Sequence, residues 1–255
     1  VLIIVIDDWG YLDLGLLASK YKDNRVKTPN LDRIAKNSLI LGNFYTQSLC
    51  TPSRLSFLTG RHVMQLGLQH EAVMSPCAKG GLFLNESTIA DAMREEGYRT
   101  VLIGKWHASF ACEKQKPLEK GFDRFFGFLL GAQSHLSHKS SVDKLQPVLD
   151  LWDDTRVVTD AEGKFGIELF GEKVVEEIES TAKKNDEPLF LFFSQQGVHN
   201  PFDVPEEWES KIPAIHDDDI HRRNYLARLL ATDASIGAAL DALERTKLLN
   251  NSVVM

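Results

Sequence analysis

The sequence has no long apolar run, no basic cluster and few cysteines. No apolar stretch reaches the ~20 residues that a membrane-spanning helix needs, so we expect no transmembrane segment. No run of five Lys or Arg residues occurs and the formal net charge is −7, which argues against a nucleic-acid-binding surface. An anionic substrate would therefore have to bind in a local basic pocket. The three cysteines allow at most one disulfide bond.

The first residues also lack a signal peptide. Residues 1–6 instead form a continuous apolar run, VLIIVI, which is typical of a strand buried on both faces. Because the sequence opens directly in such a strand, we expect its natural start and any targeting segment to lie upstream. The hydrophobic content of 43% suffices for one substantial core, and 255 residues fall within the length of one α/β domain.

Apolar strands alternate with helical patterns along the chain. Strands are predicted at 1–6, 99–103 and 188–194, and helices at 30–38, 51–60, 87–96, 166–184 and 219–246. Asn30 and Ser87 are the expected N-caps of the helices that begin near them. This alternation indicates an α/β fold with a largely parallel sheet and helices on both faces. Such sheets bind ligands beyond the carboxyl ends of their strands.

Chemically active residues follow three of the predicted strands. Asp7 and Asp8 follow the first strand, Lys105 and His107 the second, and His199 the third. Each is unremarkable alone, since paired Asp residues often only form a turn and a lone His is usually a satisfied surface or core residue. Because the carboxyl ends of parallel strands meet at one edge of a sheet, we expect these side chains to share one crevice.

The most specific pattern begins at Cys50 and reads C-x-P-S-R-x-x-x-L-T-G-R. A lone cysteine beside proline is usually structural. Here every fixed position resembles the tag at which cysteine is oxidised to formylglycine in the sulfatase family. The resemblance implies that the thiol of Cys50 becomes an aldehyde, whose hydrate supplies an oxygen nucleophile.

Further segments resemble sulfatase motifs. They are the acidic pair at 7–8, GKWH at 104–107, GFDRFFG at 121–127 and VHNPF at 198–202. The segments GLQH at 67–70 and VPEE at 204–207 resemble the arylsulfatase B group, the N-acetylgalactosamine-4-sulfatases and their paralogues. The sequence is therefore identified as a member of the formylglycine-dependent type I sulfatases, and is most similar to that group. An alkaline-phosphatase-like α/β fold is implied.

The resemblance also implies a metal site. Asp7, Asp8 and the modified Cys50 would hold Ca²⁺ or, less commonly, Mg²⁺, because carboxylate oxygens are hard ligands. One hydroxyl of the aldehyde hydrate would attack the sulfur of the substrate in line and release the alcohol. A helix beginning next to Cys50 would place this nucleophile at a helix N-terminus, which favours an anion.

The remaining site residues are assigned by the same resemblance. Arg54 and Lys105 would stabilise the aldehyde hydrate and the sulfate oxygens. His199 would protonate the leaving oxygen, and His107 would act as the base that drives sulfate off. Ser137 resembles a family position near the sulfate. Substrate contacts are therefore predicted for Lys105, Ser137 and His199.

Two departures from the family pattern leave alternatives open. Sulfatases complete the metal site with an Asp-Asn-Gly motif after the long helix, and the sequence reaches Met255 without one. We expect residues 1–255 to be the N-terminal catalytic portion of a longer sulfatase, without the end of that domain and the smaller second domain. A naturally truncated, non-catalytic protein is the alternative. Secondly, Ala108 and Ser109 replace the usual Leu-Gly after His107, which could shift the loop that places this histidine.

The implied activity is the hydrolysis of sulfate esters from a sulfated sugar, as in a glycosaminoglycan, or from an aryl sulfate. The formylglycine-generating enzyme would be a partner during maturation. A phosphonate or phosphate ester hydrolase of the same superfamily is the alternative, against which the segments at 67–70 and 198–201 speak. A lysosomal or secreted location is implied, where the sequons at Asn85 and Asn250 could carry glycans. Cys77 and Cys112 could form a disulfide there or remain two thiols.

Overall fold

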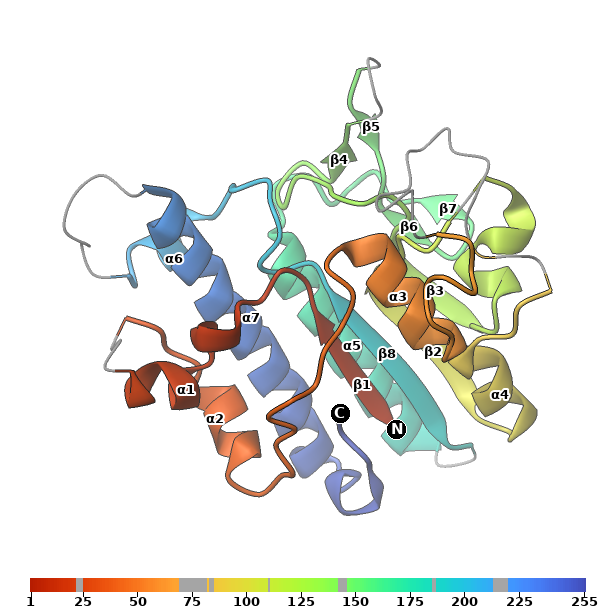
Figure 1. Ribbon diagram of the computed structural model, residues 1–255, viewed down its shortest axis with the longest axis horizontal. Helices are drawn as coiled ribbons and strands as arrows, with labels where there is room; N and C mark the ends of the chain where they lie inside the picture. The colour runs from red at the N-terminus through yellow and green to blue at the C-terminus, as the bar shows by residue number, and fades with distance from the viewer. Residues whose placement is uncertain are drawn as a thin grey trace.

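The computed structural model describes residues 1–21, 25–68, 82, 85–109, 111–141, 146–184, 187–212 and 220–255. A six-stranded sheet of order β1-β8-β2-β3-β6-β7 lies at its centre (Figure 1). Four strands are parallel: β1 (Leu2–Ile6), β8 (Leu189–Gln195), β2 (Arg99–Lys105) and β3 (Arg124–Phe128). The short strands β6 (Trp152–Asp153) and β7 (Arg156–Val157) add antiparallel pairs at one edge.

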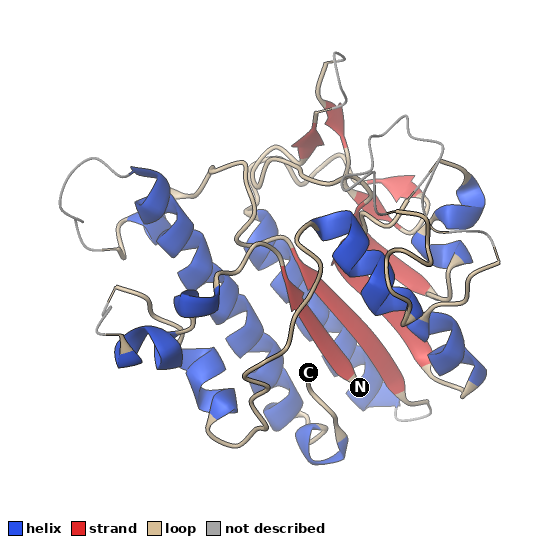
Figure 2. Cartoon of the chain, in the orientation of Figure 1, coloured by secondary structure: helices blue, strands red, loops and turns tan. Residues whose placement is uncertain are grey.

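Alternating side chains of the parallel strands build two apolar cores. Val101 and Ile103 of β2 belong to one core, whereas Leu102 belongs to the other. The first core is closed by α5 (Gly166–Lys184) and α7 (Ile220–Arg245), and the second by α3 (Cys50–Thr59) and α4 (Ile89–Glu95). Figures 1 and 2 show α3 and α4 in front of the sheet and α5 behind it. The predicted largely parallel sheet with helices on both faces is confirmed.

The other elements lie around this framework. They are η1 (Tyr11–Asp13), α1 (Gly15–Lys20), α2 (Pro29–Ala35), η2 (Glu113–Gln115), η3 (Pro117–Glu119), β4 (Lys139–Ser140), β5 (Val148–Leu149), α6 (Glu206–Glu209) and η4 (Leu249–Asn251). Strands β4 and β5 pair with each other as a separate hairpin, and Val254 forms a parallel bridge to Leu2 at the β1 edge. None of the helices in the described ranges has the length and apolar character to cross a bilayer.

The predicted cap of α2 is wrong. The N-cap is Thr28 and the helix begins at Pro29, because proline fits the first helical position, where no backbone N–H is needed. Asn30 instead donates to Asp233 of α7 through both its backbone N–H (3.1 Å) and its side-chain amide (2.8 Å). The helix ends at Ala35, earlier than the predicted end at residue 38.

The predicted cap of α4 is also wrong, by one residue. Thr88, not Ser87, accepts a hydrogen bond from the backbone N–H of Asp91 at 3.2 Å, and the Asp91 carboxylate accepts the Thr88 N–H at 2.9 Å. This reciprocal pair is a capping box, which satisfies two backbone donors at once. Thr88, and not the neighbouring Ser87, is therefore the N-cap.

Candidate active site

Side chains from three strand ends and one helix meet at the carboxyl edge of the sheet. Lys105 Nζ, at the end of β2, donates to Asp7 Oδ2 after β1 at 2.5 Å. Arg54 of α3 places Nη2 3.3 Å from Asp7 Oδ1. Its Nη1 donates to Ser194 Oγ in β8 at 2.5 Å and to the Lys105 carbonyl at 3.1 Å. The predicted convergence of Asp7 and Lys105 is thus present, and Arg54 joins it.

This cluster is buried and carries more positive than negative charge. Asp7 is 6% exposed, Arg54 6% and Lys105 1%. Burial by itself would raise the pKa of Asp7, but the charges of Arg54 and Lys105 outweigh it and hold the pKa well below its usual range. Burial lowers the pKa of Lys105, and the Asp7 carboxylate opposes this change. With Lys105 protonated, two cations face one carboxylate, so the cluster favours an additional anion.

Gly104 allows this close approach of strands. Its φ is +106°, and a Cβ there would overlap the carbonyl of Ser194 on β8. Only glycine therefore fits where β2 passes β8 immediately before Lys105. As a result, the Ser194 hydroxyl donates to the Lys105 carbonyl at 2.6 Å.

Cys50 is the first residue of α3 and is half-buried. A negative charge at Cys50 would, like the carboxylate of Asp7, oppose the effect of burial on the pKa of Lys105, so the sulfur lies within electrostatic reach of that ammonium. The N-cap residue Leu49 makes no side-chain cap hydrogen bond. The first turn of α3 therefore keeps backbone donors and a positive dipole end beside the position of the predicted nucleophile.

His107 lies against the same helix turn. Its Nε2 is 3.3 Å from the hydroxyl of Thr51, the neighbour of Cys50. The residue has a φ of +44° and is 1% exposed. A Cβ added to Gly131 would lie 2.7 Å from the ring Cε1, so the imidazole occupies space that only a glycine leaves open. The Ala108-Ser109 departure thus leaves His107 beside the tag.

His199 lies at the acidic pair that follows β1. Its Nε2 is 3.6 Å from Asp8 Oδ2, and its Nδ1 is 2.6 Å from the Asn200 carbonyl. Since a carbonyl only accepts, Nδ1 carries hydrogen and Nε2 is the atom available to react. The backbone of Asp7 also exchanges hydrogen bonds with residues 197 and 198, at 3.1 and 2.8 Å. Asp8 itself has a φ of +59°, a conformation that nonglycine residues adopt rarely.

Two supporting residues have no recognisable signal in the sequence. Tyr225 of α7 donates to Asp13 at 2.8 Å and accepts the N–H of Gly10 at 3.2 Å, which holds the turn after Asp8. Burial, chiefly, raises the pKa of Tyr225 to about 12. His135 is fully buried with Nε2 3.0 Å from the carbonyl of His199, and burial lowers its pKa to about 4. Tyr225 lies in α7 and His135 in a turn, and neither residue belongs to a recognised motif.

Other predicted residues are less closely placed. Ser137 lies in the turn at 135–137, and its backbone N–H donates to Ser134 Oγ at 3.0 Å, so its contact with sulfate stays a prediction. Gln69, His70 and Cys77 lie outside the described residues. The pairing of Cys77 with Cys112, which is exposed, therefore also stays a prediction.

The residues of the predicted metal site fit a cation only in part. Asp7 and Asp8 are adjacent carboxylates, and the depressed pKa of Asp7 keeps it ionised. Ca²⁺ takes six to eight oxygen ligands, however, and no group of three His, Cys, Asp or Glu side chains in the described ranges is arranged to hold a metal. Binding of calcium by Asp7, Asp8 and Cys50 therefore stays a prediction.

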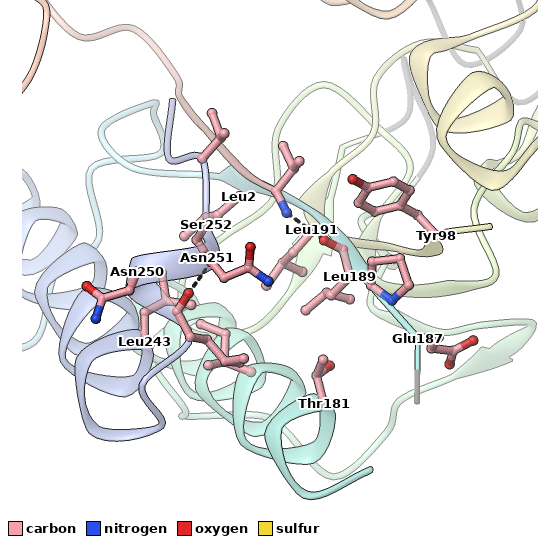
Figure 3. Close-up of a pocket in the computed structure, with 15 residues that line it drawn as sticks. Leu2, Tyr98, Thr181, Glu187, Leu189, Leu191, Leu243, Asn250, Asn251 and Ser252 are labelled. Carbon is pink, nitrogen blue, oxygen red and sulfur yellow. Dashed lines mark hydrogen bonds between the residues drawn. The ribbon is translucent and has the colours of Figure 1, made fainter. Parts of the chain in front are cut away.

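A cavity of about 680 Å³ lies at the opposite edge of the sheet (Figure 3). Leu2, Leu189 and Tyr98 line it, at the amino ends of β1 and β8 and just before β2. It contains none of the predicted site residues. The predicted site residues that the structure describes lie instead toward the carboxyl edge, where a parallel sheet is expected to bind ligands.

Comparison with known proteins agrees with this geometry. The sequence profile of the family described as Sulfatase matches residues 1–255. The chain belongs to the sulfatase family. This sulfatase is 33% identical over 256 residues to arylsulfatase J of Mus musculus, a match that covers 100% of the chain and 41% of the mouse protein. It matches human arylsulfatase A at 28% identity over 100% of the chain and 50% of that protein. The chain thus spans about half the length, or less, of these relatives.

Solved structures share the fold of this sulfatase. The crystal structure of Ps i-CgsB has a TM-score of 0.83 at 23% identity, covering 99% of this chain and 56% of that one. BT4656, solved in complex with its substrate D-glucosamine-2-N,6-O-disulfate, has a TM-score of 0.72 at 18% identity, covering 100% and 64%. A Vibrio parahaemolyticus protein of the alkaline phosphatase superfamily has a TM-score of 0.57 at 20% identity, and the match covers 96% of this chain and 50% of that one. The predicted alkaline-phosphatase-like fold is confirmed.

Proposed function

We propose that this protein hydrolyses sulfate esters. The observation that carries the proposal is the buried cluster in which Arg54 and Lys105 share the single carboxylate of Asp7, beside the sulfatase tag at Cys50. An excess of fixed positive charge in a water-poor site stabilises an anionic sulfate and the charge that develops as the ester bond breaks. Membership of the sulfatase family supports the same activity.

The nucleophile and the metal come from groups that the chain would acquire. Formylglycine derived from Cys50 would supply the attacking oxygen, and the formylglycine-generating enzyme is the partner that this requires. A bound Ca²⁺ would supply positive charge for the anionic sulfate. Its ligands would be the carboxylates of Asp7 and Asp8 and the modified side chain of Cys50. Mg²⁺ is the less favoured metal.

The residues of the chain then divide the work by position. Arg54 and Lys105 hold the sulfate oxygens. Their positions are fixed because Asp7 accepts from Lys105 and the Lys105 backbone carbonyl accepts from Arg54. His199 Nε2, when protonated, delivers its proton to the leaving oxygen from the open side near Asp8. His107 lies at Thr51, one residue from Cys50, and would act as the base that drives sulfate off.

The substrate that we propose is a sulfated sugar of a glycosaminoglycan, with aryl sulfates as artificial substrates. The resemblance of the segments at 67–70 and 204–207 to the arylsulfatase B group supports this choice. Residues 1–255 would form the catalytic part of the enzyme. We also propose a lysosomal or secreted location, with glycans on Asn85 and Asn250, which are both exposed.

The test uses full-length protein from a eukaryotic secretory host that carries the maturing enzyme. We expect tryptic mass spectrometry to find formylglycine at Cys50, and we expect release of sulfate from an aryl sulfate and from sulfated N-acetylgalactosamine. Cys50→Ala should abolish turnover while the melting temperature is retained. Only unmodified thiol and no sulfate release would refute the proposal, and faster cleavage of a matched phosphate ester would favour the alternative hydrolase.

A further inference from the structure

Arg228 of α7 is a buried charge with no role in the proposed chemistry. It is 0% exposed. Its Nη1 donates to the Pro201 carbonyl at 2.9 Å, and its guanidinium carbon lies 4.6 Å from the centre of the Phe202 ring. Within the described part of the chain, Nε and Nη2 have no hydrogen-bond partner. The side chain therefore makes both of its close polar and aromatic contacts with the segment that follows His199.

This arrangement is unfavourable for stability alone. A buried guanidinium loses several kcal/mol of hydration unless its donors are paired, and here one carbonyl and one aromatic face are the partners. Burial lowers the pKa of Arg228 to about 10, although the charge of Asp203 acts in the opposite direction. An apolar side chain of similar length would fill the same space without this penalty. Something other than folding stability therefore accounts for the charge.

The segment held by Arg228 carries a proposed catalytic group. Residues 199–203 contact the neighbouring loop at two further points. The carbonyl of His199 lies 3.0 Å from His135 Nε2, and Asp203 Oδ2 accepts the Ser134 hydroxyl at 2.7 Å. From α7, Arg228 holds the segment between these two points through the Pro201 carbonyl and the Phe202 ring, and Asn224 adds a longer bond of 3.4 Å to the Phe202 carbonyl. Without Arg228, the middle of the segment would keep only the longer Asn224 bond and the contact of the Phe202 ring with His221.

We propose that Arg228 is the positioning residue of His199. By holding Pro201 and Phe202 it fixes the segment so that His199 Nε2 stays beside Asp8, where a leaving oxygen can receive its proton. This inference rests on the proposed function, because it takes His199 to be the acid. Arg228 touches no reacting atom, so its effect passes entirely through the histidine.

The test compares three variants of the full-length protein. Arg228→Met removes the charge at nearly constant length, Arg228→Lys keeps it, and Arg245→Met removes a surface arginine from the far end of the same helix. We expect kcat of Arg228→Met for sugar or alkyl sulfates to fall ~10–100-fold, part of the range for acid catalysis, with KM changed less than about threefold. Activated aryl sulfates should lose less than about threefold, because their leaving groups need little protonation. Arg228→Lys should recover part of the loss, and Arg245→Met should behave as wild type.

Two further measurements distinguish positioning from a merely structural role. If Arg228 positions His199, the melting temperature of Arg228→Met should be unchanged or higher, because an apolar residue replaces a poorly paired buried charge. In a His199→Ala background, Arg228→Met should leave the ratio between the two substrate types unchanged, because the residues act through one group. Equal losses on both substrates, or losses that add to those of His199→Ala, would overturn the inference.

A spectroscopic measurement separates this inference from the proposed function. The ring resonances of His199 can be assigned in histidine-labelled protein by comparison with His199→Ala, and followed at one fixed pH. Arg228→Met should shift or broaden them while those of His62, which is exposed, stay in place. If wild-type protein turned over no sulfate ester, the proposed function would fail but this result would still decide the positioning role. Unchanged His199 resonances would overturn it.

Discussion

Lys105 Nζ donates to one oxygen of Asp7 at 2.5 Å, while the guanidinium of Arg54 approaches the other oxygen at 3.3 Å. One carboxylate thereby joins two cations that come from a strand and a helix. The arrangement holds the carboxyl ends of β1 and β2 and the start of α3 together. Since the cations outnumber the carboxylate, it also leaves charge for an anionic substrate.

Replacing Asp7 should destabilise the fold. Asp7→Asn leaves two buried cations without a counter-charge, and removal of one partner of a buried pair typically costs ~3–5 kcal/mol. We expect a loss of that order in the free energy of unfolding, measured by urea denaturation at pH 7 in the presence of EDTA. The matched control is Asp241→Asn, whose ion pair with Arg33 is about half exposed and should be worth ~0–1 kcal/mol. Similar losses in both variants would contradict the central role of Asp7.

His135 should make the protein sensitive to mild acid. Its pKa is lowered from 6.5 to about 4, so it stays neutral in the folded state while the unfolded chain takes up a proton. The contribution of neutral His135 to the free energy of unfolding is complete above pH 6.5 and is lost as the pH falls from 6.5 to about 4. The linked loss is on the order of 3 kcal/mol, from about 1.4 kcal/mol for each pH unit. Denaturation curves at pH 7 and pH 4 should therefore differ less in His135→Gln than in wild type, whereas His62→Gln should leave the difference unchanged.

Calcium binding should depend on Asp8 without affecting the fold. The Asp8 side chain is 59% exposed, so its removal disturbs no buried charge. In full-length protein we expect Asp8→Ala to weaken Ca²⁺ binding by about tenfold or more, since affinity follows the number of charged ligands. Isothermal titration calorimetry measures this, and the melting temperature in EDTA should match wild type. Wild-type affinity in Asp8→Ala would place the metal elsewhere, and Asp241→Ala serves as the control for loss of a surface carboxylate.

The two histidines should fail in different ways. If His199 protonates the leaving oxygen, His199→Ala should slow the hydrolysis of sugar sulfates ~10²–10⁴-fold and that of an activated aryl sulfate far less. His107→Ala should instead give a burst of alcohol release followed by slow turnover, whatever the leaving group, because sulfate release becomes limiting. Stopped-flow measurement with both substrate types distinguishes the cases. Equal losses in His199→Ala for both substrates would leave the two histidines as residues that only position sulfate.

Local patterns in the sequence were sufficient for the framework and for the tag. The run at 1–6, the strand before Lys105 and the helix at 166–184 follow from apolar periodicity, which depends on neighbouring residues alone. The Cys50 tag follows from its own pattern of residues. The shared edge of Asp7, Lys105 and His199 follows because parallel strands bring their carboxyl ends to one side of the sheet. The prediction of Ser87 as the cap of α4 was wrong, although Asp91 stands three residues after Thr88, where a capping box places its acceptor side chain.

The partners of those residues were decided by tertiary packing. Asp7 and Lys105 are 98 positions apart, and no periodicity specifies which cation reaches which carboxylate. Tyr225, His135 and Arg228 carry no motif, yet α7 and the loop at 134–138 bring them against the acidic pair and the His199 segment. The sequence determined which chemical groups follow the carboxyl end of each strand, because those residues are neighbours of the strand in the chain. Only the packing of helices and loops determined burial and distance, and these set the charge and the orientation with which each group meets the others.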